Sequence, residues 1–392
     1  MKILMVLESE FPPDDRVEKE ALSLINDGHQ VAIACYTFKK PVSAQNYRGI
    51  IIFRKYIPRL IYKSSVGALR FPVYFRYWSR YLKQVIKENS FDTLHIHDLP
   101  LAKTGFRMSH QFRIKLVIDL HENYPASLRT TTHTQKKLLG RILHSDRQWR
   151  RYEKKYVQKT DLLITVVEEM KQRIVKLGAD AGKIVVLENT PLLNEYDPPE
   201  NKPSPDFITL FYAGGINIYR GLQIVIDGMA LLIPGIPNLR LWIIGKGSYE
   251  QDLRRQIQKK GLNEHVTFFG WKPLKEISAL LAQSDIALIP HLKSEQTDCS
   301  SPNKIYQYAL ANKPIVCSNC NSLERLINEW NNGIVYIHDS PDDFSKKVGD
   351  LIKSDKFRQM GLNGKMHIVN KYNWNNSVRS LLTAYKNLQM NI

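Results

Sequence analysis

Residues 190–206, TPLLNEYDPPENKPSPD, separate two parts of the chain that share one sequence pattern. The segment contains five prolines and has no apolar periodicity, so neither a helix nor a central strand is expected there. We interpret residues 191–206 as a linker. Because 392 residues are too many for one ordinary core, we expect one domain over residues 1–190 and a second domain after the linker.

The part before the linker alternates short β-branched runs with helical stretches. Such alternation predicts a parallel sheet with helices on both faces. The expected strands are Ile3–Leu7, Gln30–Cys35, Ile50–Phe53, Thr93–His97, Lys115–Asp119, Leu162–Val166 and Ile184–Leu187. The expected helices are Asp15–Asn26, Val73–Lys87, Gln135–Val157 and Glu168–Leu177.

The same alternation restarts after the linker. The expected strands are Ile208–Tyr212, Arg240–Ile244, Val266–Phe268, Ile286–Ile289 and Ile315–Cys317. The expected helices are Gly221–Leu232, Tyr249–Lys259, Lys275–Ala282 and Pro302–Ala311. The fold class is therefore α/β, with two doubly wound, Rossmann-like domains. Ligands of such sheets bind beyond the carboxyl ends of the strands, so function is expected in the loops that follow strands.

Composition excludes several classes of protein. A hydrophobic share of 43% is enough for sizeable cores, and no apolar run approaches the roughly 20 residues of a membrane-spanning helix. The apolar run before Glu8 is too short for a signal-peptide core and predicts a buried first strand. Four cysteines make no disulfide framework at this length, and Cys317 and Cys320 lack the second pair that a zinc site would need. We expect a cytoplasmic protein.

Positive charge is concentrated before the linker. The chain has a net charge of +18, and residues 1–190 carry 33 Lys and Arg against 19 Asp and Glu. In residues 72–87, PVYFRYWSRYLKQVIK, basic residues recur at helical spacing opposite an aromatic and aliphatic stripe. The helix could be an ordinary half-buried one, could rest on anionic lipid, or could stack the bases of single-stranded nucleic acid. No recognisable nucleic-acid module accompanies it, so we expect no nucleic-acid partner.

Three strand-to-helix loops after the linker carry groups that could hold phosphate. Glycine lets the backbone approach a pyrophosphate, while helix N–H groups and basic side chains stabilise its charge. The loops are FYAGGINIYRGL with Gly214, Gly215 and Arg220, LWIIGKGSYE with Gly245, Lys246 and Gly247, and SSPNK with Ser300, Ser301 and Lys304. Each glycine pair could equally be a tight turn, and Ser301 is expected to cap the helix that follows it. Neither a P-loop nor a G-x-G-x-x-G fingerprint occurs, which argues against an ATPase and an ordinary dehydrogenase.

These loops, together with stretches before the linker, resemble the family 4 glycosyltransferases, which are retaining enzymes of the GT-B fold. The other matching stretches are HVTFFGWKPLKEISALLAQSDIALIP, SSPNKIYQYALANKPIV, FPPDDRVEKEALSLINDGHQV, LHIHDLPLA, IDLHENYP, DLLITVVEEM and IVVLENTP. The terminal YNWNNSVRSLLTAY looks like the family's last helix. The resemblance implies that residues 207–371 bind the nucleotide sugar, that residues 1–190 bind the acceptor, and that a helix in residues 372–392 packs back on the acceptor domain.

The resemblance also implies roles for single residues. Arg220 and Lys304 would face the diphosphate of a UDP- or GDP-linked sugar, and His121 would lie near the transferred sugar, these three being the catalytic candidates. The nucleotide-binding candidates are Gly215, Lys246, Gly270, Trp271, Ser300, Ser301 and Gln307. GT-B enzymes generally need no bound metal, so neither a metal nor another cofactor is expected, and basic groups would stabilise the leaving diphosphate.

Two positions depart from the family pattern. The family commonly carries two glutamates eight positions apart, where this chain has Cys299 and Gln307. The amide oxygen of Gln307 can still accept a hydrogen bond from a ribose hydroxyl, although such a neutral bond is roughly half as strong as a charge-assisted one. Cys299 is a poor replacement for glutamate, and Glu295 lies four residues before it.

We therefore expect a metal-independent retaining glycosyltransferase that builds a surface polysaccharide or a lipid-linked glycan. Its acceptor would be a glycan or a lipid-diphosphate-linked sugar, and its basic N-terminal domain would rest on the inner face of the cell membrane. Two alternatives stay open: a catalytically impaired protein that binds nucleotide sugar without turnover, and a sugar-nucleotide epimerase on the same fold.

Overall fold

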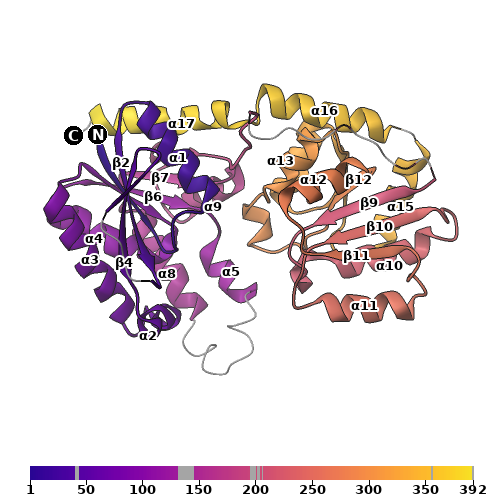
Figure 1. Ribbon diagram of the computed structural model, residues 1–392, viewed down its shortest axis with the longest axis horizontal. Helices are drawn as coiled ribbons and strands as arrows, with labels where there is room; N and C mark the ends of the chain where they lie inside the picture. Colours follow the sequence, from indigo (N-terminus) through magenta and orange to yellow (C-terminus); the bar gives the residue numbers. More distant parts are fainter. Residues whose placement is uncertain are drawn as a thin grey trace. The chain divides into compact units, whose positions relative to one another are not determined.

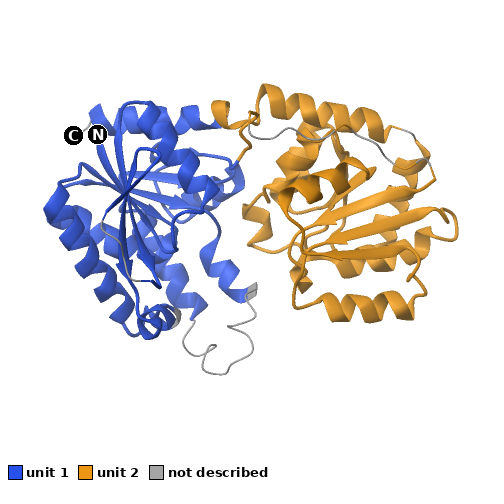
Figure 2. Ribbon diagram, in the orientation of Figure 1, with its two compact units in different colours: residues 1–189, 377–392 blue, residues 190–376 orange. Residues whose placement is uncertain are grey.

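The computed structural model describes residues 1–39, 44–130, 145–194, 200, 204, 206–354 and 356–390. The chain forms two compact units, one made of residues 1–189 and 377–392 and the other of residues 190–376 (Figure 2). The first unit is therefore built from two separate stretches of sequence, whereas the second is continuous. Among the described residues, no helix has both the length and the apolar character needed to cross a membrane.

The first unit contains an eight-stranded sheet with the order β3-β4-β2-β1-β5-β6-β7-β8. Its strands are β1 (Lys2–Leu7), β2 (Gln30–Thr37), β3 (Gln45–Tyr47), β4 (Ile50–Tyr56), β5 (Thr93–His97), β6 (Lys115–Leu120), β7 (Leu162–Thr165) and β8 (Ile184–Val186). All pairings are parallel except the one between β3 and β4. The sequence predicted every strand of this sheet but β3, a short polar edge strand without an apolar run.

Helices cover both faces of this sheet, as alternating strands and helices require. They are α1 (Asp15–Asn26), α2 (Arg59–Lys63), α3 (Val73–Asn89), α4 (Ala102–Phe112), α5 (Tyr124–Thr130), α8 (Asp146–Val157), α9 (Glu168–Lys176) and α17 (Trp374–Met390). Figure 1 shows α3 and α4 on one face and α1 and α17 on the other. Of the predicted helix over residues 135–157, residues 135–144 lie outside the described part of the chain.

Residues 377–390 of α17 complete the core of the first unit. Ser380 Oγ donates a hydrogen bond to Val186 O at 2.9 Å, at the far edge of the sheet. Tyr385 is fully buried, and its hydroxyl oxygen lies 2.9 Å from His95 Nδ1 in the central strand β5. The end of the described chain is thus fixed at both the edge and the middle of the sheet that the beginning of the chain forms.

The second unit contains a six-stranded, wholly parallel sheet with the order β11-β10-β9-β12-β13-β14. Its strands are β9 (Ile208–Ala213), β10 (Leu239–Ile244), β11 (Val266–Gly270), β12 (Ile286–Ile289), β13 (Ile315–Ser318) and β14 (Gly333–Tyr336). The predicted strands β9 to β13 are confirmed. β14 was missed: its apolar run is only four residues long, and it follows asparagine and glycine residues that are typical of a turn.

Two hydrophobic cores lie on the two faces of this sheet. The helices are α10 (Leu222–Leu232), α11 (Glu250–Lys259), α12 (Leu274–Ala282), α13 (Lys304–Leu310), α14 (Asn321–Trp330), α15 (Pro341–Lys353) and α16 (Phe357–Asn370). Figure 1 shows α10 and α11 on the face opposite to α12 and α13. In both units the parallel strands deliver their following loops to one edge of the sheet, where the predicted site residues lie.

Candidate active site

Three loops of the second unit are hydrogen-bonded to one another at the carboxyl ends of β9, β10 and β11. Gly214 N donates to Ile244 O at 2.9 Å, and Gly245 N donates to Gly270 O at 2.7 Å. The ladder between neighbouring strands therefore continues into the loops that follow them. This edge of the sheet is consequently a layer of backbone with few side chains of its own.

The glycines of the second loop permit this close packing. A Cβ at Gly245 would lie 1.9 Å from Gly214 O, and a Cβ at Gly247 would lie 1.9 Å from Ile216 O. Any side chain at either position would force the neighbouring loops apart. Close packing of the loops is therefore sufficient to explain glycine at both positions. The side chain of Lys246, between them, is exposed.

Lys304, the first residue of α13, lies against the loop that follows β9. Its Nζ donates to Ala213 O at 2.5 Å and lies 4.3 Å from the ring centroid of Tyr212. A Cβ at Gly214 would lie 2.4 Å from Nζ, whereas a Cβ at Gly215 would meet only a side-chain amide at 3.3 Å. The glycine that makes room beside the lysine is therefore Gly214, the neighbour of the predicted Gly215.

Arg220 is held by a histidine that the sequence analysis did not identify. One guanidinium nitrogen, Nη1, lies 2.7 Å from Nε2 of His291. Because a guanidinium can only donate, Nε2 must accept, and the imidazole must be neutral. Burial, followed by the charges of Arg220 and Lys304, holds the pKa of His291 well below its usual value. The sequence could have indicated His291 through its position, because it follows the predicted strand β12 and strand ends of this sheet share one edge.

The two basic side chains give this edge an unbalanced positive charge. Neither Arg220 nor Lys304 forms an ion pair with a carboxylate within the described part of the chain. Burial, and secondly the charge of Arg220, lower the pKa of Lys304 to about 7. Two neighbouring cations without a carboxylate disfavour each other's charge, and a bound anion would relieve that cost.

The third loop differs from its prediction at Ser301. Helix α13 begins at Lys304, two residues later than predicted, and its N-cap residue makes no side-chain hydrogen bond to the helix. The prediction that Ser301 caps the helix is wrong, because its hydroxyl lies 3.2 Å from the hydroxyl of Tyr306. Ser300 is also occupied locally, since its Oγ donates to Gln296 O at 3.0 Å.

The remaining nucleotide-binding candidates lie in the same unit at positions consistent with a ligand. Gly270 ends β11 with φ of +69°, and Trp271 follows it with 69% of its surface exposed. Gln307 lies on α13 one turn after Lys304 and is half-buried. The other position that departs from the family pattern, Cys299, is buried, whereas Glu295 is exposed.

The first unit presents its own polar site at the ends of β5 and β6. His121 follows β6, and its Nε2 lies 2.7 Å from Oδ2 of the buried Asp119. Its Nδ1 lies 3.5 Å from Oδ2 of Asp98, and 21% of its side chain is exposed. Burial alone would lower the pKa of His121, but the two carboxylates raise it to about 9. His121 is therefore a partly exposed cation at neutral pH.

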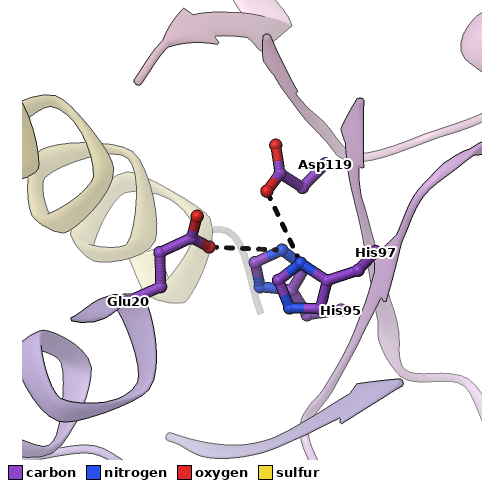
Figure 3. A group of neighbouring side chains, drawn as sticks. All are labelled: Glu20, His95, His97 and Asp119. Carbon is purple, nitrogen blue, oxygen red and sulfur yellow. Dashed lines mark ion pairs between the residues drawn. The ribbon is translucent and has the colours of Figure 1, made fainter. Parts of the chain in front are cut away.

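Behind His121 lies a buried group of four side chains, Glu20, His95, His97 and Asp119 (Figure 3). Their potential ligand atoms lie within 4.8 Å of one another, which is compact enough to suggest a metal site. However, the guanidinium of Arg16 lies 3.0 Å from a carboxylate oxygen of both Glu20 and Asp119. A metal ion would have to share these carboxylates with a buried cation, so we assign the four residues to a charge network.

Two family models match the chain one after the other. The model described as Glycosyltransferase Family 4 matches residues 17–190, and the model described as Glycosyl transferases group 1 matches residues 194–365. Together they span most of both units. The chain belongs to the group 1, family 4 glycosyltransferases.

Known proteins resemble this glycosyltransferase over its whole length. A phosphatidyl-myo-inositol mannosyltransferase of Mycolicibacterium smegmatis is 22% identical and covers 98% of this chain and 94% of its own. The structure of sucrose-phosphate synthase from Thermosynechococcus elongatus has a TM-score of 0.78 at 14% identity, with full coverage of both chains. That of Anabaena Alr3699/HepE in complex with UDP has a TM-score of 0.71 at 16% identity, covering 99% of this chain and 100% of its own. The GT-B fold predicted from the sequence is confirmed.

The glycines after β9 provide a test of the anion site in this glycosyltransferase. We expect Gly214→Ala to weaken the binding of inorganic pyrophosphate by about tenfold or more, because the new Cβ would displace Nζ of Lys304 and remove a charge-assisted contact. Isothermal titration calorimetry measures the dissociation constant. The control Gly215→Ala should change it by less than about threefold, and equal losses in both variants would contradict the role assigned to Gly214.

Proposed function

We propose that this glycosyltransferase uses a nucleotide-diphosphate sugar as donor and binds its diphosphate at Arg220 and Lys304. The observation that carries the proposal is the pair of basic side chains without a carboxylate partner, at the edge of the sheet where ligands of this fold class bind. The UDP bound by Anabaena HepE supports a nucleotide donor. The base would lie near Gly270 and Trp271, and the ribose near Gln307.

The same two cations would serve the reaction itself. Breaking the bond between the sugar and the diphosphate leaves negative charge on the phosphate oxygens, and fixed positive groups stabilise that charge in the transition state. Arg220 is already oriented by His291, and Lys304 by Ala213 O, so little reorganisation is needed when the charge develops. We propose on this basis a reaction without a metal, with the anomeric configuration of the sugar retained as the family resemblance implies.

We propose that the acceptor is a glycan or a lipid-linked sugar at an anionic membrane surface, where a surface polysaccharide would be assembled. The mannosyltransferase of Mycolicibacterium smegmatis is named for a lipid acceptor, which supports this choice. In the first unit, most of the aromatic residues of α3 are buried, and four basic side chains lie exposed on the other face of the helix, together with Gln84 and Glu88. The four basic residues are Arg76, Arg80, Lys83 and Lys87.

Exposed apolar side chains occur in the stretch of chain just before this basic stripe. Leu60 of α2 is 83% exposed, and Phe71 and Val73, at the start of α3, are 61% and 46% exposed. Exposed Arg59, Lys63 and Arg70 lie in the same stretch of chain. Exposed leucine and phenylalanine among basic residues fit the boundary between lipid headgroups and acyl chains. The burial of Tyr74, Phe75, Trp78 and Tyr81 favours a lipid surface over a stacking platform for nucleic-acid bases.

A second candidate function is nucleotide-sugar binding without efficient turnover. It is favoured by Gln307, because a neutral amide lies one turn after Lys304 where the family commonly has a glutamate, and by the burial of Cys299. A glutamate would hold a ribose hydroxyl more strongly. Gln307→Glu separates the two candidates, because it should raise the turnover of an impaired enzyme and leave the turnover of an adapted enzyme unchanged or lower.

Thermal unfolding with nucleotides tests the donor assignment. We expect UDP, GDP or one of their sugars, added without metal, to stabilise the protein by about 2.7 kcal/mol at 100 times the dissociation constant. Lys304→Ala should abolish most of that stabilisation, whereas Lys246→Ala, which changes an exposed lysine of the next loop, should reduce it less. A protein that no nucleotide stabilises would contradict the donor site.

The protonation of Lys304 predicts how donor binding depends on pH. The lysine binds the diphosphate only when charged, and its pKa in the free protein is lowered to about 7. The affinity for a nucleotide sugar should therefore be fully developed below pH 7 and fall by up to about tenfold per pH unit above it, until the pKa of the bound state is reached. Lys304→Arg, which keeps its charge, should remove this dependence in the same titration.

Co-sedimentation with vesicles tests the membrane surface. We expect glutamine at Arg76, Arg80, Lys83 and Lys87 to reduce binding to vesicles of phosphatidylglycerol and phosphatidylcholine at least tenfold, since each base near an anionic surface contributes about 1 kcal/mol. The matched control places glutamine at four exposed bases of the second unit, Arg254, Arg255, Lys259 and Lys260. Equal binding of the wild-type protein to neutral vesicles, or equal losses in both variants, would contradict the proposal.

A further inference from the structure

Asp98 adopts a backbone conformation that aspartate rarely adopts. It follows β5 and precedes a short 3-10 helix, Leu99–Leu101, and has φ of 67° and ψ of 158°. This region of backbone space is essentially restricted to glycine. Such strain persists only where the surrounding structure imposes it, and it is concentrated at functional sites. The question is what an aspartate provides here that a glycine would not.

Capping of the following helix does not account for the aspartate. Although Asp98 occupies the N-cap position of the 3-10 helix, its side chain makes no capping hydrogen bond. Its backbone N–H donates to Asp119 O at 2.8 Å, a bond that a glycine would form equally well. The carboxylate must therefore be the reason for the aspartate.

That carboxylate faces His121. Oδ2 of Asp98 lies 3.5 Å from Nδ1 of His121, and Oδ1 lies 3.4 Å from the backbone nitrogen of the same residue. On the opposite side of the ring, Nε2 lies 2.7 Å from Oδ2 of Asp119. The imidazole is thus placed between two carboxylates, of which Asp119 is fully buried while about one third of the Asp98 side chain is exposed.

We propose that Asp98 is a positioning residue for His121: its strained backbone places a carboxylate at Nδ1, fixes the orientation of the ring and keeps both ring nitrogens protonated. The inference rests on the proposed function for the role of His121 beside the transferred sugar. Both N–H groups of the cationic imidazole face carboxylates, so its contribution there would be a fixed positive charge beside the transferred sugar. Glycine in place of Asp98 would give a more relaxed backbone and a less precisely held, less basic imidazole.

None of the other titratable groups described around His121 places a negative charge at its Nδ1. Asp119 shares its charge with the guanidinium of Arg16, whose Nε and Nη2 lie 3.2 and 3.0 Å from its two oxygens. His97, whose Nδ1 lies 3.2 Å from Nε2 of His121, has its pKa lowered by burial and adds no charge. Burial likewise raises the pKa of Glu20 to about 8, so this carboxyl is largely neutral at pH 7. Asp98 is therefore the carboxylate that acts on Nδ1.

Two substitutions at this position separate strain from charge. Asp98→Gly should unfold about 2–4 °C above Asp98→Asn, because both variants lose the carboxylate and only the glycine relieves the backbone strain, and it should reduce kcat/KM at least tenfold. Asp98→Asn should lower the melting temperature by about 1–3 °C, because the charged imidazole loses a stabilising carboxylate, and reduce kcat/KM similarly. In both variants the pKa of His121, followed by NMR in histidine-labelled protein, should fall by about one pH unit, because one of two neighbouring carboxylates is lost.

A matched control is Arg113→Gly. Arg113 also has a positive φ, of 55°, but it ends α4 and is not part of the site. Its replacement should stabilise the protein without changing the pKa of His121 or kcat/KM. A general effect of glycine at positive φ is thereby distinguished from an effect of the aspartate.

The proposal is overturned if the pKa of His121 is the same in Asp98→Asn as in the wild-type protein, or if Asp98→Gly unfolds at a lower temperature than Asp98→Asn. The melting temperature and the NMR titration require no turnover. If they behave as expected while no nucleotide sugar is consumed, the positioning of His121 stands and the proposed function fails. If turnover is found but the titration is unchanged, the proposed function stands and the positioning role fails.

Discussion

Parallel strand pairing is the constraint on which the rest of this structure depends. Because parallel neighbours run in one direction, the loop after each strand leaves at the same edge of the sheet. In the second unit, β9, β10 and β11 place their loops side by side, and the strand–strand hydrogen bonding continues into those loops through Gly214 and Gly245. In the first unit, β5 and β6 bring Asp98 and His121 together in the same way. Residues far apart in the sequence therefore become neighbours because their strands are adjacent, whatever the sequences of the loops.

The two units differ in whether their positive charges are paired with carboxylates. The second unit keeps Arg220 and Lys304 close together without a carboxylate, so their charges are left for a ligand to balance. The first unit places the buried Arg16 against the carboxylate of Asp119, which balances its charge internally. An unbalanced site costs stability when it is empty and gains free energy when an anion arrives, whereas a balanced network holds its members in fixed positions. The first arrangement suits binding, and the second suits the orientation of a neighbouring group such as His121.

The sequence predicted the sheets well and the details of the site only in part. Long β-branched runs flanked by turn residues identified the parallel strands, because burial on both faces imposes such runs, but the polar edge strand β3 left no comparable signal. Arg220 and Lys304 were selected because they stand in strand-to-helix loops with glycine or serine, and His121 because it follows a strand in a stretch that resembles the family. His291 was missed because nothing local distinguishes a histidine that supports an arginine from one that packs in a loop. The same limit explains why Gly215 was chosen where Gly214 makes the room, since only the position of Nζ of Lys304 in space separates the two.

The contribution of α17 to the first unit has a consequence for the order in which the protein can fold. Residues 377–390 are synthesised after the whole of the second unit, yet Tyr385 fills a fully buried position against His95 in the centre of the first sheet. The continuous second unit can complete its cores as it leaves the ribosome. The first unit is synthesised first, but the face of its sheet that α17 covers stays exposed until α17 has been synthesised. During synthesis the first unit is thus the later of the two to complete its core, and its exposed apolar face is the surface that a chaperone would meet.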